Sequence, residues 1–195
     1  MSLKRLPLLL SPLLLAVTSS TPITVPLSSQ PWTLSNPSLN ISVPATLPSQ
    51  AHLDLFAAGV IGDPYHDLND FNLRWVAWSN WTYTSGPIHG LKGSKDNATA
   101  TSPSTWLRFD GLDTFAEISL CGRRVASTDN QFRQWWFDVT DILRQACADD
   151  GDVVLELEFG SAPKIASELA ARPGAETWPP GVQQVYELED RWWIR

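Results

Sequence analysis

The sequence predicts a mostly β protein, an antiparallel β-sandwich with one or two short helices. In residues 153–159 the apolar Val153, Leu155, Leu157 and Phe159 fall on one face and Val154, Glu156 and Glu158 on the other, and residues 114–120 show a similar alternation, as expected for half-buried strands. Turn-forming pairs separate these runs at intervals of about ten residues, which favours a sandwich over a parallel sheet. The pairs are Asp110-Gly111, Cys121-Gly122 and Asp129-Asn130.

The N-terminus predicts a secretory signal peptide over residues 1–20. Lys4 and Arg5 form a basic start, residues 6–17 are apolar, and small residues follow at 18–20. This apolar run is much shorter than the roughly 20 residues that cross a bilayer. We therefore expect a secreted, extracellular protein without a membrane anchor, whose mature part is one domain over residues 21–195.

Two helices are expected between the strands. The first runs near Ser49 to Ala58, with Ser49 as its cap, and its apolar side is formed by Leu53, Phe56, Ala57 and Val60. The second spans residues 141–147 with Thr140 as its cap. Residues 80–104 are rich in short polar residues, glycine and proline, so we expect a surface loop there.

Shorter strands are expected at residues 106–109 and 135–139. In the strand at 153–159, the alternation places Glu156 and Glu158 on the solvent side. The chain has 10 Trp, and four of them lie in strand-like segments and are expected in the core because a buried indole removes a large apolar area from water. These four are Trp75, Trp78, Trp81 and Trp106.

The composition excludes several classes of function. With 14 Lys and Arg against 21 Asp and Glu the formal net charge is −7, so no basic face for nucleic acid is expected. His52, His66 and His89 show no metal-ligand spacing, and no nucleotide-binding or serine-nucleophile motif occurs. We expect no metal, no cofactor and no catalytic residue in this chain, because its carboxylates lie at turns or on the solvent side of strands.

Secretion changes the interpretation of the cysteines and of three sequons. Cys121 and Cys147 can form a disulfide in an oxidising compartment, and two buried thiols are the alternative. Asn40, Asn80 and Asn97 each begin an N-x-Ser/Thr triplet and are expected to carry glycans. For Asn80 the alternative is burial, since aromatic residues surround it in sequence.

Several short stretches occur in a specific order and spacing along nearly the whole mature chain. They are Val43-Pro44-Ala45, residues 50–55, residues 58–62, residues 68–75, Asn80-Trp81-Thr82-Tyr83, residues 109–116, residues 126–133 and residues 159–163. Each stretch is short, but in their joint order and spacing they resemble the N-terminal part of secreted fungal β-mannosidases of glycoside hydrolase family 2.

The resemblance implies a jelly-roll sandwich of the galactose-binding type. It also implies a retaining hydrolase that removes terminal β-mannose from oligosaccharides of mannan and N-glycan cores by using two glutamates. In the family both glutamates lie in a later (β/α)8 barrel, which we expect to be absent from this chain, so the chain alone is expected to be inactive. The family is also compatible with a homodimer of the full-length enzyme.

Two functions from different classes remain at this stage. The chain is either an N-terminal domain that shapes the mannose pocket and packs on the missing catalytic barrel, or a free-standing carbohydrate-binding module. Trp192 and Trp193 are adjacent, so in a strand one of them points away from the sandwich core. We expect Trp192, Trp193 or Arg195 to face the barrel or the sugar.

Overall fold

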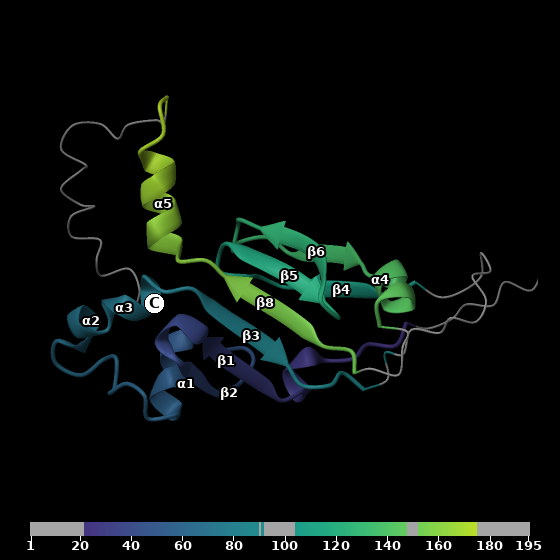
Figure 1. The fold of residues 1–195 in the computed structure, drawn as a ribbon, viewed down its shortest axis with the longest axis horizontal. Helices are drawn as coiled ribbons and strands as arrows, with labels where there is room; N and C mark the ends of the chain where they lie inside the picture. The colour runs from purple at the N-terminus through teal and green to yellow at the C-terminus, as the bar shows by residue number, and fades with distance from the viewer. Residues whose placement is uncertain (1–21, 90, 92–103, 148–151, 175–195) are drawn as a thin grey trace, which may run out of the picture.

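The protein forms two antiparallel sheets with short helices around them, as seen in a computed structural model. The structure describes residues 22–89, 91, 104–147 and 152–174 (Figure 1). Its elements are η1 Leu27–Ser29, β1 Trp32–Asn36, η2 Pro37–Leu39, β2 Ile41–Ala45, α1 Ala51–Ala57, α2 Asn69–Asn72, α3 Arg74–Ala77, β3 Trp81–Ser85, β4 Trp106–Phe109, β5 Ala116–Leu120, β6 Arg123–Thr128, β7 Trp135–Asp138, α4 Thr140–Gln145, β8 Leu155–Phe159 and α5 Ala162–Ala170.

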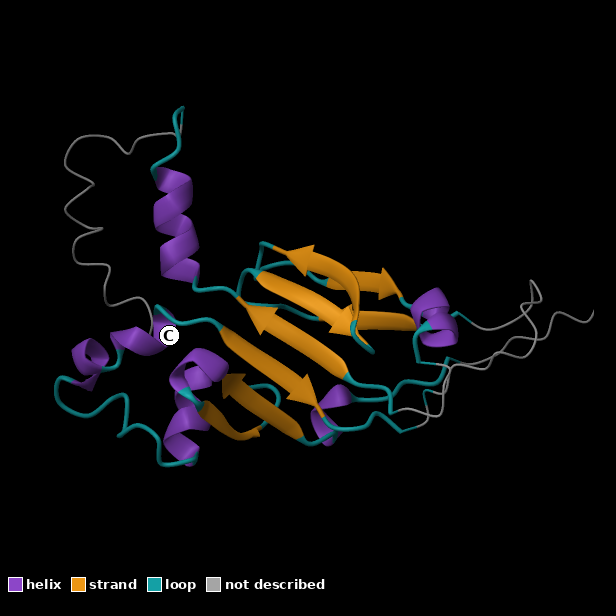
Figure 2. Ribbon diagram, in the orientation of Figure 1, coloured by secondary structure: helices purple, strands orange, loops and turns teal. Residues whose placement is uncertain are grey.

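The larger sheet has six strands in the order β2-β1-β3-β8-β5-β6, and every neighbouring pair is antiparallel. Strands β1–β3 from the first half of the chain therefore form one side of the sheet and β5, β6 and β8 form the other, and Figure 2 shows them as one continuous twisted layer. Strands β4 and β7 form a separate antiparallel pair. Leu107, Phe109 and Phe137 of this pair pack against the core, so the pair forms a second layer.

The core lies on the inner face of the six-stranded sheet. The alternation expected for residues 153–159 and 114–120 is confirmed, because Leu155, Leu157 and Ile118 are buried while Glu156 and Glu158 are exposed. The side chains that are completely enclosed come from both sheet halves and from α1 and α3. They are Leu34, Leu55, Val76, Ile118 and Leu155.

The predicted fold class, mostly β with antiparallel sheets and short helices, is confirmed. The number of helices was underestimated, since the described residues also contain α2, α3 and α5. The prediction of a loop over residues 80–104 was wrong at its start. Trp81–Ser85 is the central strand β3, in which Trp81, Tyr83 and Ser85 are buried between β1 and β8.

The first helix lies where expected, and it contacts β2 at the edge of the sheet. It ends in a Schellman motif, in which Gly59 has a φ of 71° and the Val60 amide donates to the Leu55 carbonyl at 2.9 Å. Glycine adopts this left-handed conformation without a steric penalty. The expected cap was wrong, because Gln50 holds the cap position, without a side-chain bond, and Ser49 binds Asp54 instead.

The second expected helix is α4, whose buried residue is Leu143, and it ends at Gln145, before the buried Cys147. Its expected cap was also wrong. Val139 occupies the cap position, and Thr140 is the first helical residue.

Candidate functional site

Six large apolar side chains on α1–α3 and the segment between them are exposed. We call this set the apolar helical surface: Leu53, Phe56, Val60, Leu68, Phe71 and Trp78. Three of them had been expected on the buried side of α1. That expectation was wrong, because Asp54 and Leu55 are the buried residues of the helix. A set of this size on one group of helices is typical of a surface that another protein region covers.

A buried carboxylate on the inner side of α1 holds the helix in place. Asp54 is 4% exposed and accepts hydrogen bonds from the Thr46 amide at 3.2 Å, the Ser49 hydroxyl at 3.0 Å and the Tyr83 hydroxyl at 3.0 Å. These bonds compensate for the loss of water around the carboxylate. Burial and the carboxylate together raise the pKa of Tyr83, so its hydroxyl stays a donor. The network ties α1 to the preceding loop and to β3.

His52 lies on the same helix, and its side chain contacts the backbone of Leu73, the residue just before α3. Burial lowers the pKa of His52, and a hydrogen bond with the Leu73 backbone opposes this shift without cancelling it. The neutral imidazole is therefore part of the contact between α1 and Leu73. Protonating it places a charge at a partly buried position, which is unfavourable.

A second exposed surface is the outer side of strands β4 and β7. We call it the β4–β7 outer face, and it consists of Trp106, Arg108, Trp136 and Asp138. Trp106 is opposite Asp138, and Arg108 is opposite Trp136, so the two indoles lie on one diagonal and the two charged groups on the other. Trp106 is 53% and Trp136 is 52% exposed, which makes the core placement expected for Trp106 wrong.

Polar contacts hold the side chains of the β4–β7 outer face in place. Arg108 donates to Asp110 through two nitrogens, at 2.9 and 2.6 Å, and its guanidinium carbon lies 5.0 Å from the centre of the Trp136 ring. Gln134 also donates to Asp110, at 3.0 Å. The result is a pair of indole rings with planar polar groups beside them.

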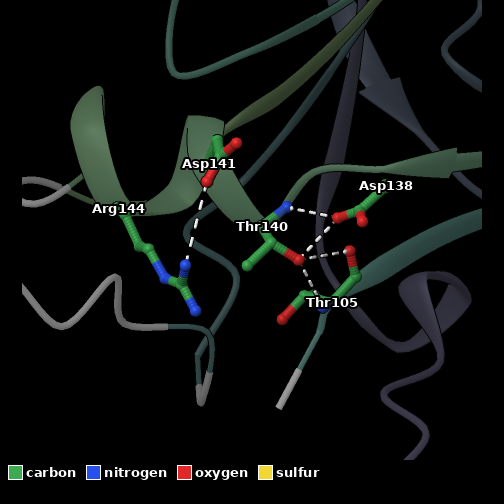
Figure 3. A network of polar contacts seen from close by, with 5 residues as sticks. All are labelled: Thr105, Asp138, Thr140, Asp141 and Arg144. Atoms are coloured by element: carbon green, nitrogen blue, oxygen red, sulfur yellow. Dashed lines mark hydrogen bonds and ion pairs between the residues drawn. The ribbon is translucent and has the colours of Figure 1, made fainter. Parts of the chain in front are cut away.

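The far end of this face is fixed by a threonine network (Figure 3). The Thr140 amide and hydroxyl donate to Asp138 at 3.0 and 2.5 Å, and the Thr140 hydroxyl accepts from the Thr105 amide at 2.8 Å. These bonds join the start of β4 to the start of α4. They also hold the pKa of Asp138 below its ordinary value, the hydroxyl bond being the larger cause, so the carboxylate stays ionised.

One pair of carboxylates faces each other across the six-stranded sheet. Glu117 on β5 is opposite Glu158 on β8, at the spacing of neighbouring strands. Both are exposed, and Arg124 donates to Glu117 at 2.7 Å. A retaining glycosidase needs two carboxyl groups that flank a bound sugar in an enclosed site. This pair lies on an open sheet face, and Arg124 neutralises one member.

The two cysteines are joined in the structure. Cys121 and Cys147 have Cα atoms 5.7 Å apart, and their disulfide links the β5–β6 hairpin to the end of α4. The hairpin turn is Cys121-Gly122, whose φ angles are 49° and 71°, as in the two-residue turns that match strand twist. A cavity of about 380 Å³ next to this link is lined by Arg123, Arg124, Ile142, Gln145 and Ala146.

The other predicted tryptophans divide between core and surface. Trp81 is buried, as expected, and Trp75 is half-buried and packs against the core, with its ring centre 6.2 Å from that of Trp81. Trp78 is 49% exposed, which makes its predicted core position wrong. Trp192, Trp193 and Arg195 lie outside the described residues.

The sequons lie in different surroundings. Asn40 is exposed in a left-handed turn before β2. Asn80 is also exposed, but its side-chain oxygen accepts from the Ser161 amide at 2.9 Å, where it joins the start of α5 to the start of β3. Asn97 lies outside the described residues, as does the predicted signal peptide.

Within the described residues, no three His, Cys, Asp or Glu side chains are placed to hold a metal ion. Across the same residues, the structure contains no helix with the length and apolar character needed to span a bilayer.

Comparison with known families decides what kind of domain this is. The family described as "Glycosyl hydrolase 2 galactose-binding domain-like" matches residues 32–195. The chain belongs to this family. The fungal β-mannosidase resemblance is confirmed as well. The chain is 57% identical to β-mannosidase A of Aspergillus terreus over 84% of its length, and 54% identical to that of Aspergillus aculeatus over 87%.

A solved structure agrees with this family assignment. The β-D-mannosidase of Dictyoglomus thermophilum matches 77% of this chain with a TM-score of 0.64 and 29% identity. The chain spans about one sixth of the length of these relatives, 16% of the Aspergillus terreus protein and 17% of the Dictyoglomus chain. This galactose-binding-like domain is therefore similar to the N-terminal region of much longer glycosidases.

Proposed function

We propose that this chain is the N-terminal galactose-binding-like domain of a β-mannosidase that hydrolyses terminal β-mannosides. The observation that supports this most strongly is the 57% identity to a β-mannosidase A over 84% of the chain. The substrates are oligosaccharides from mannan and N-glycan cores. The catalytic acid and nucleophile come from the longer protein, because the Glu117 and Glu158 pair is open to solvent and bound by Arg124.

In this proposal the domain docks on the catalytic region through the apolar helical surface. Its exposed rings and aliphatic side chains gain free energy when a second domain removes them from water. The buried Asp54 network supports the docking role, because it fixes α1 to β3 and so keeps the surface in one shape. Interfaces of this kind hold the domains of one chain together.

A chimera tests the proposed function. This chain replaces the matching N-terminal region of the Aspergillus terreus relative, and hydrolysis of an aryl β-mannoside is measured for the chimera and for the chain alone. We expect turnover by the chimera and none by the chain. Turnover by the chain alone that disappears in Glu117→Gln or Glu158→Gln would contradict the assignment of catalysis to another region.

We further propose that residues 1–20 are a signal peptide and that the mature protein is extracellular and glycosylated at Asn40, Asn80 and Asn97. The Cys121–Cys147 bridge supports an oxidising compartment. Secretion from a fungal host, N-terminal sequencing and glycosidase treatment test this proposal. Thr82→Ala removes the Asn80 sequon but keeps the bond from Ser161, whereas Asn80→Ala removes both, so the pair separates a glycan effect from a structural one.

A homodimer of the full-length enzyme is a further part of the proposal, and it rests on the family resemblance alone. Sedimentation of the chimera tests it. A monomer at micromolar concentration would contradict it.

A further inference from the structure

We propose that the β4–β7 outer face binds oligosaccharides made of linked pyranose rings, the β-mannan class of sugar. The proposal deepens the proposed function and rests on it for the class of sugar. It names the surface of this chain that contacts such a ligand.

The two indoles provide flat surfaces for sugar rings. Trp106 and Trp136 are each about half exposed and project from the same side of adjacent strands. A pyranose has a face of C–H groups with slight positive charge, and the face of an indole carries the negative side of its quadrupole. Stacking the two faces also removes apolar area from water. Two rings on one diagonal suit a ligand of several linked sugars.

The charged diagonal provides hydrogen bonds for sugar hydroxyls. Asp138 is an ionised acceptor. Arg108 has five N–H donors, and two of its three nitrogens donate to Asp110. Each sugar hydroxyl both donates and accepts, so it can bond to either group. A second protein surface made of apolar groups would instead remove Arg108 and Asp138 from water and offer no partner for the hydrogen-bonding groups that Asp110 and Thr140 leave free, at a cost in free energy. This charge pattern therefore favours a sugar over an apolar protein partner.

The face is already organised before a ligand arrives. Asp110 holds both Arg108 and Gln134, and Arg108 lies over the Trp136 ring. Thr140 fixes Asp138 and joins the starts of β4 and α4. A preformed surface loses little conformational entropy on binding, which matters for a weak ligand such as a neutral sugar.

A titration of the 195-residue chain with β-1,4-mannotetraose tests the proposal. Nuclear magnetic resonance follows the indole N–H signals, which are assigned by single substitution. We expect the signals of Trp106 and Trp136 to shift and saturate, and we expect Trp106→Ala or Trp136→Ala to weaken binding about tenfold or more. The phenylalanine variants at these positions keep a ring and should retain most of the affinity.

Trp78→Ala is the matched control, because Trp78 has almost the same exposure but lies on the apolar helical surface. It should leave the affinity unchanged. No saturable shift in the folded chain, or equal weakening by Trp78→Ala, would overturn the proposal. The hydrolysis by the chimera is scored separately. An active chimera without binding at this face overturns only the proposal that the β4–β7 outer face binds sugar. Saturable binding with an inactive chimera overturns only the proposed function.

Discussion

The apolar helical surface and the β4–β7 outer face both expose large side chains, but they differ in what surrounds those side chains. The six side chains of the apolar helical surface carry no charge, although the segment between the helices also exposes His66 and Asp67, and the supporting carboxylate, Asp54, is buried. On β4–β7 each indole has an ionised neighbour on the same face. The first surface suits an apolar protein partner, and the second suits a ligand that is rich in hydroxyl groups.

The two regions also lie apart and are anchored differently. In Figure 1 the helices α1–α3 lie at the opposite end of the molecule from α4, which the Thr105–Thr140 bond joins to the start of β4. Hydrogen bonds to one buried carboxylate hold the helical end, whereas a disulfide and the Thr140 network hold the other. Conditions that loosen one end should therefore leave the other largely intact, and four stability measurements test this difference.

The largest expected effect is that of the disulfide. Its loop spans Cys121 to Cys147, so replacing both cysteines by serine should lower the free energy of unfolding by about 3.5 kcal/mol. Chemical denaturation of the oxidised chain and of the double variant measures this. In the double variant, at denaturant concentrations below the unfolding midpoint, hydrogen exchange should rise first in α4 and the β5–β6 hairpin. Exchange that rises first in α1 would show that the two ends are not separately anchored.

The next effect separates two leucines of the same helix. Leu55 is 0% exposed and Leu53 is 42% exposed. Leu55→Ala should cost about 3 kcal/mol because it leaves a cavity, whereas Leu53→Ala should change the free energy of unfolding by no more than about 0.5 kcal/mol. Equal losses in urea unfolding would mean that the outer side of α1 is packed in the isolated chain.

A smaller effect is expected for the hydroxyl of Tyr83. Tyr83→Phe removes a bond to buried Asp54 and should lower the free energy of unfolding by about 1 kcal/mol. Tyr65→Phe is the control, since Tyr65 is exposed and should give no change. A Tyr83→Phe chain as stable as the original would show that Asp54 does not depend on this donor.

The smallest effect is a pH dependence of the helical end. Burial lowers the pKa of folded His52 below its ordinary value of 6.5, so the unfolded chain takes up this proton first as the pH falls. The stability that neutral His52 contributes is present above pH 6.5 and is lost as the pH falls through the lower folded pKa. His52→Gln should flatten this part of the pH profile of the melting temperature, and His66→Gln, at an exposed position, should not. Identical profiles for the two variants would contradict the role of His52.

Sequence patterns predicted β5 and β8 of the six-stranded sheet and the pair β4 and β7, but they did not predict β1, β2, β3 or β6. The alternation at residues 153–159 requires only that one face of a sheet be buried, and it was correct. Trp81-Thr82-Tyr83-Thr84 carries the same signal, which the nearby glycine and proline residues obscured. For α1, the spacing of Leu53, Phe56 and Val60 does indicate a contact surface. Periodicity alone cannot show that the surface remains open in this chain.

The candidate surfaces depended on contacts between distant residues. The bond between Asp54 and Tyr83 joins positions that are 29 residues apart. The β4–β7 outer face depends on the register of two strands that are separated in sequence by β5 and β6. Neither follows from local spacing. Trp78 and Trp106 were placed in the core because of their size, but size gives the gain from burial and not the direction in which a side chain points.

Hydrogen exchange of the chain alone and within the Aspergillus terreus chimera tests the central claim most directly. The claim is that the rest of a β-mannosidase covers the apolar helical surface and leaves the β4–β7 outer face open. We predict slower exchange in α1–α3 of the chimera and equal exchange in β4 and β7 until β-1,4-mannotetraose is added. Equal exchange in α1–α3, with protection of β4 and β7 by the chimera alone, would contradict the claim.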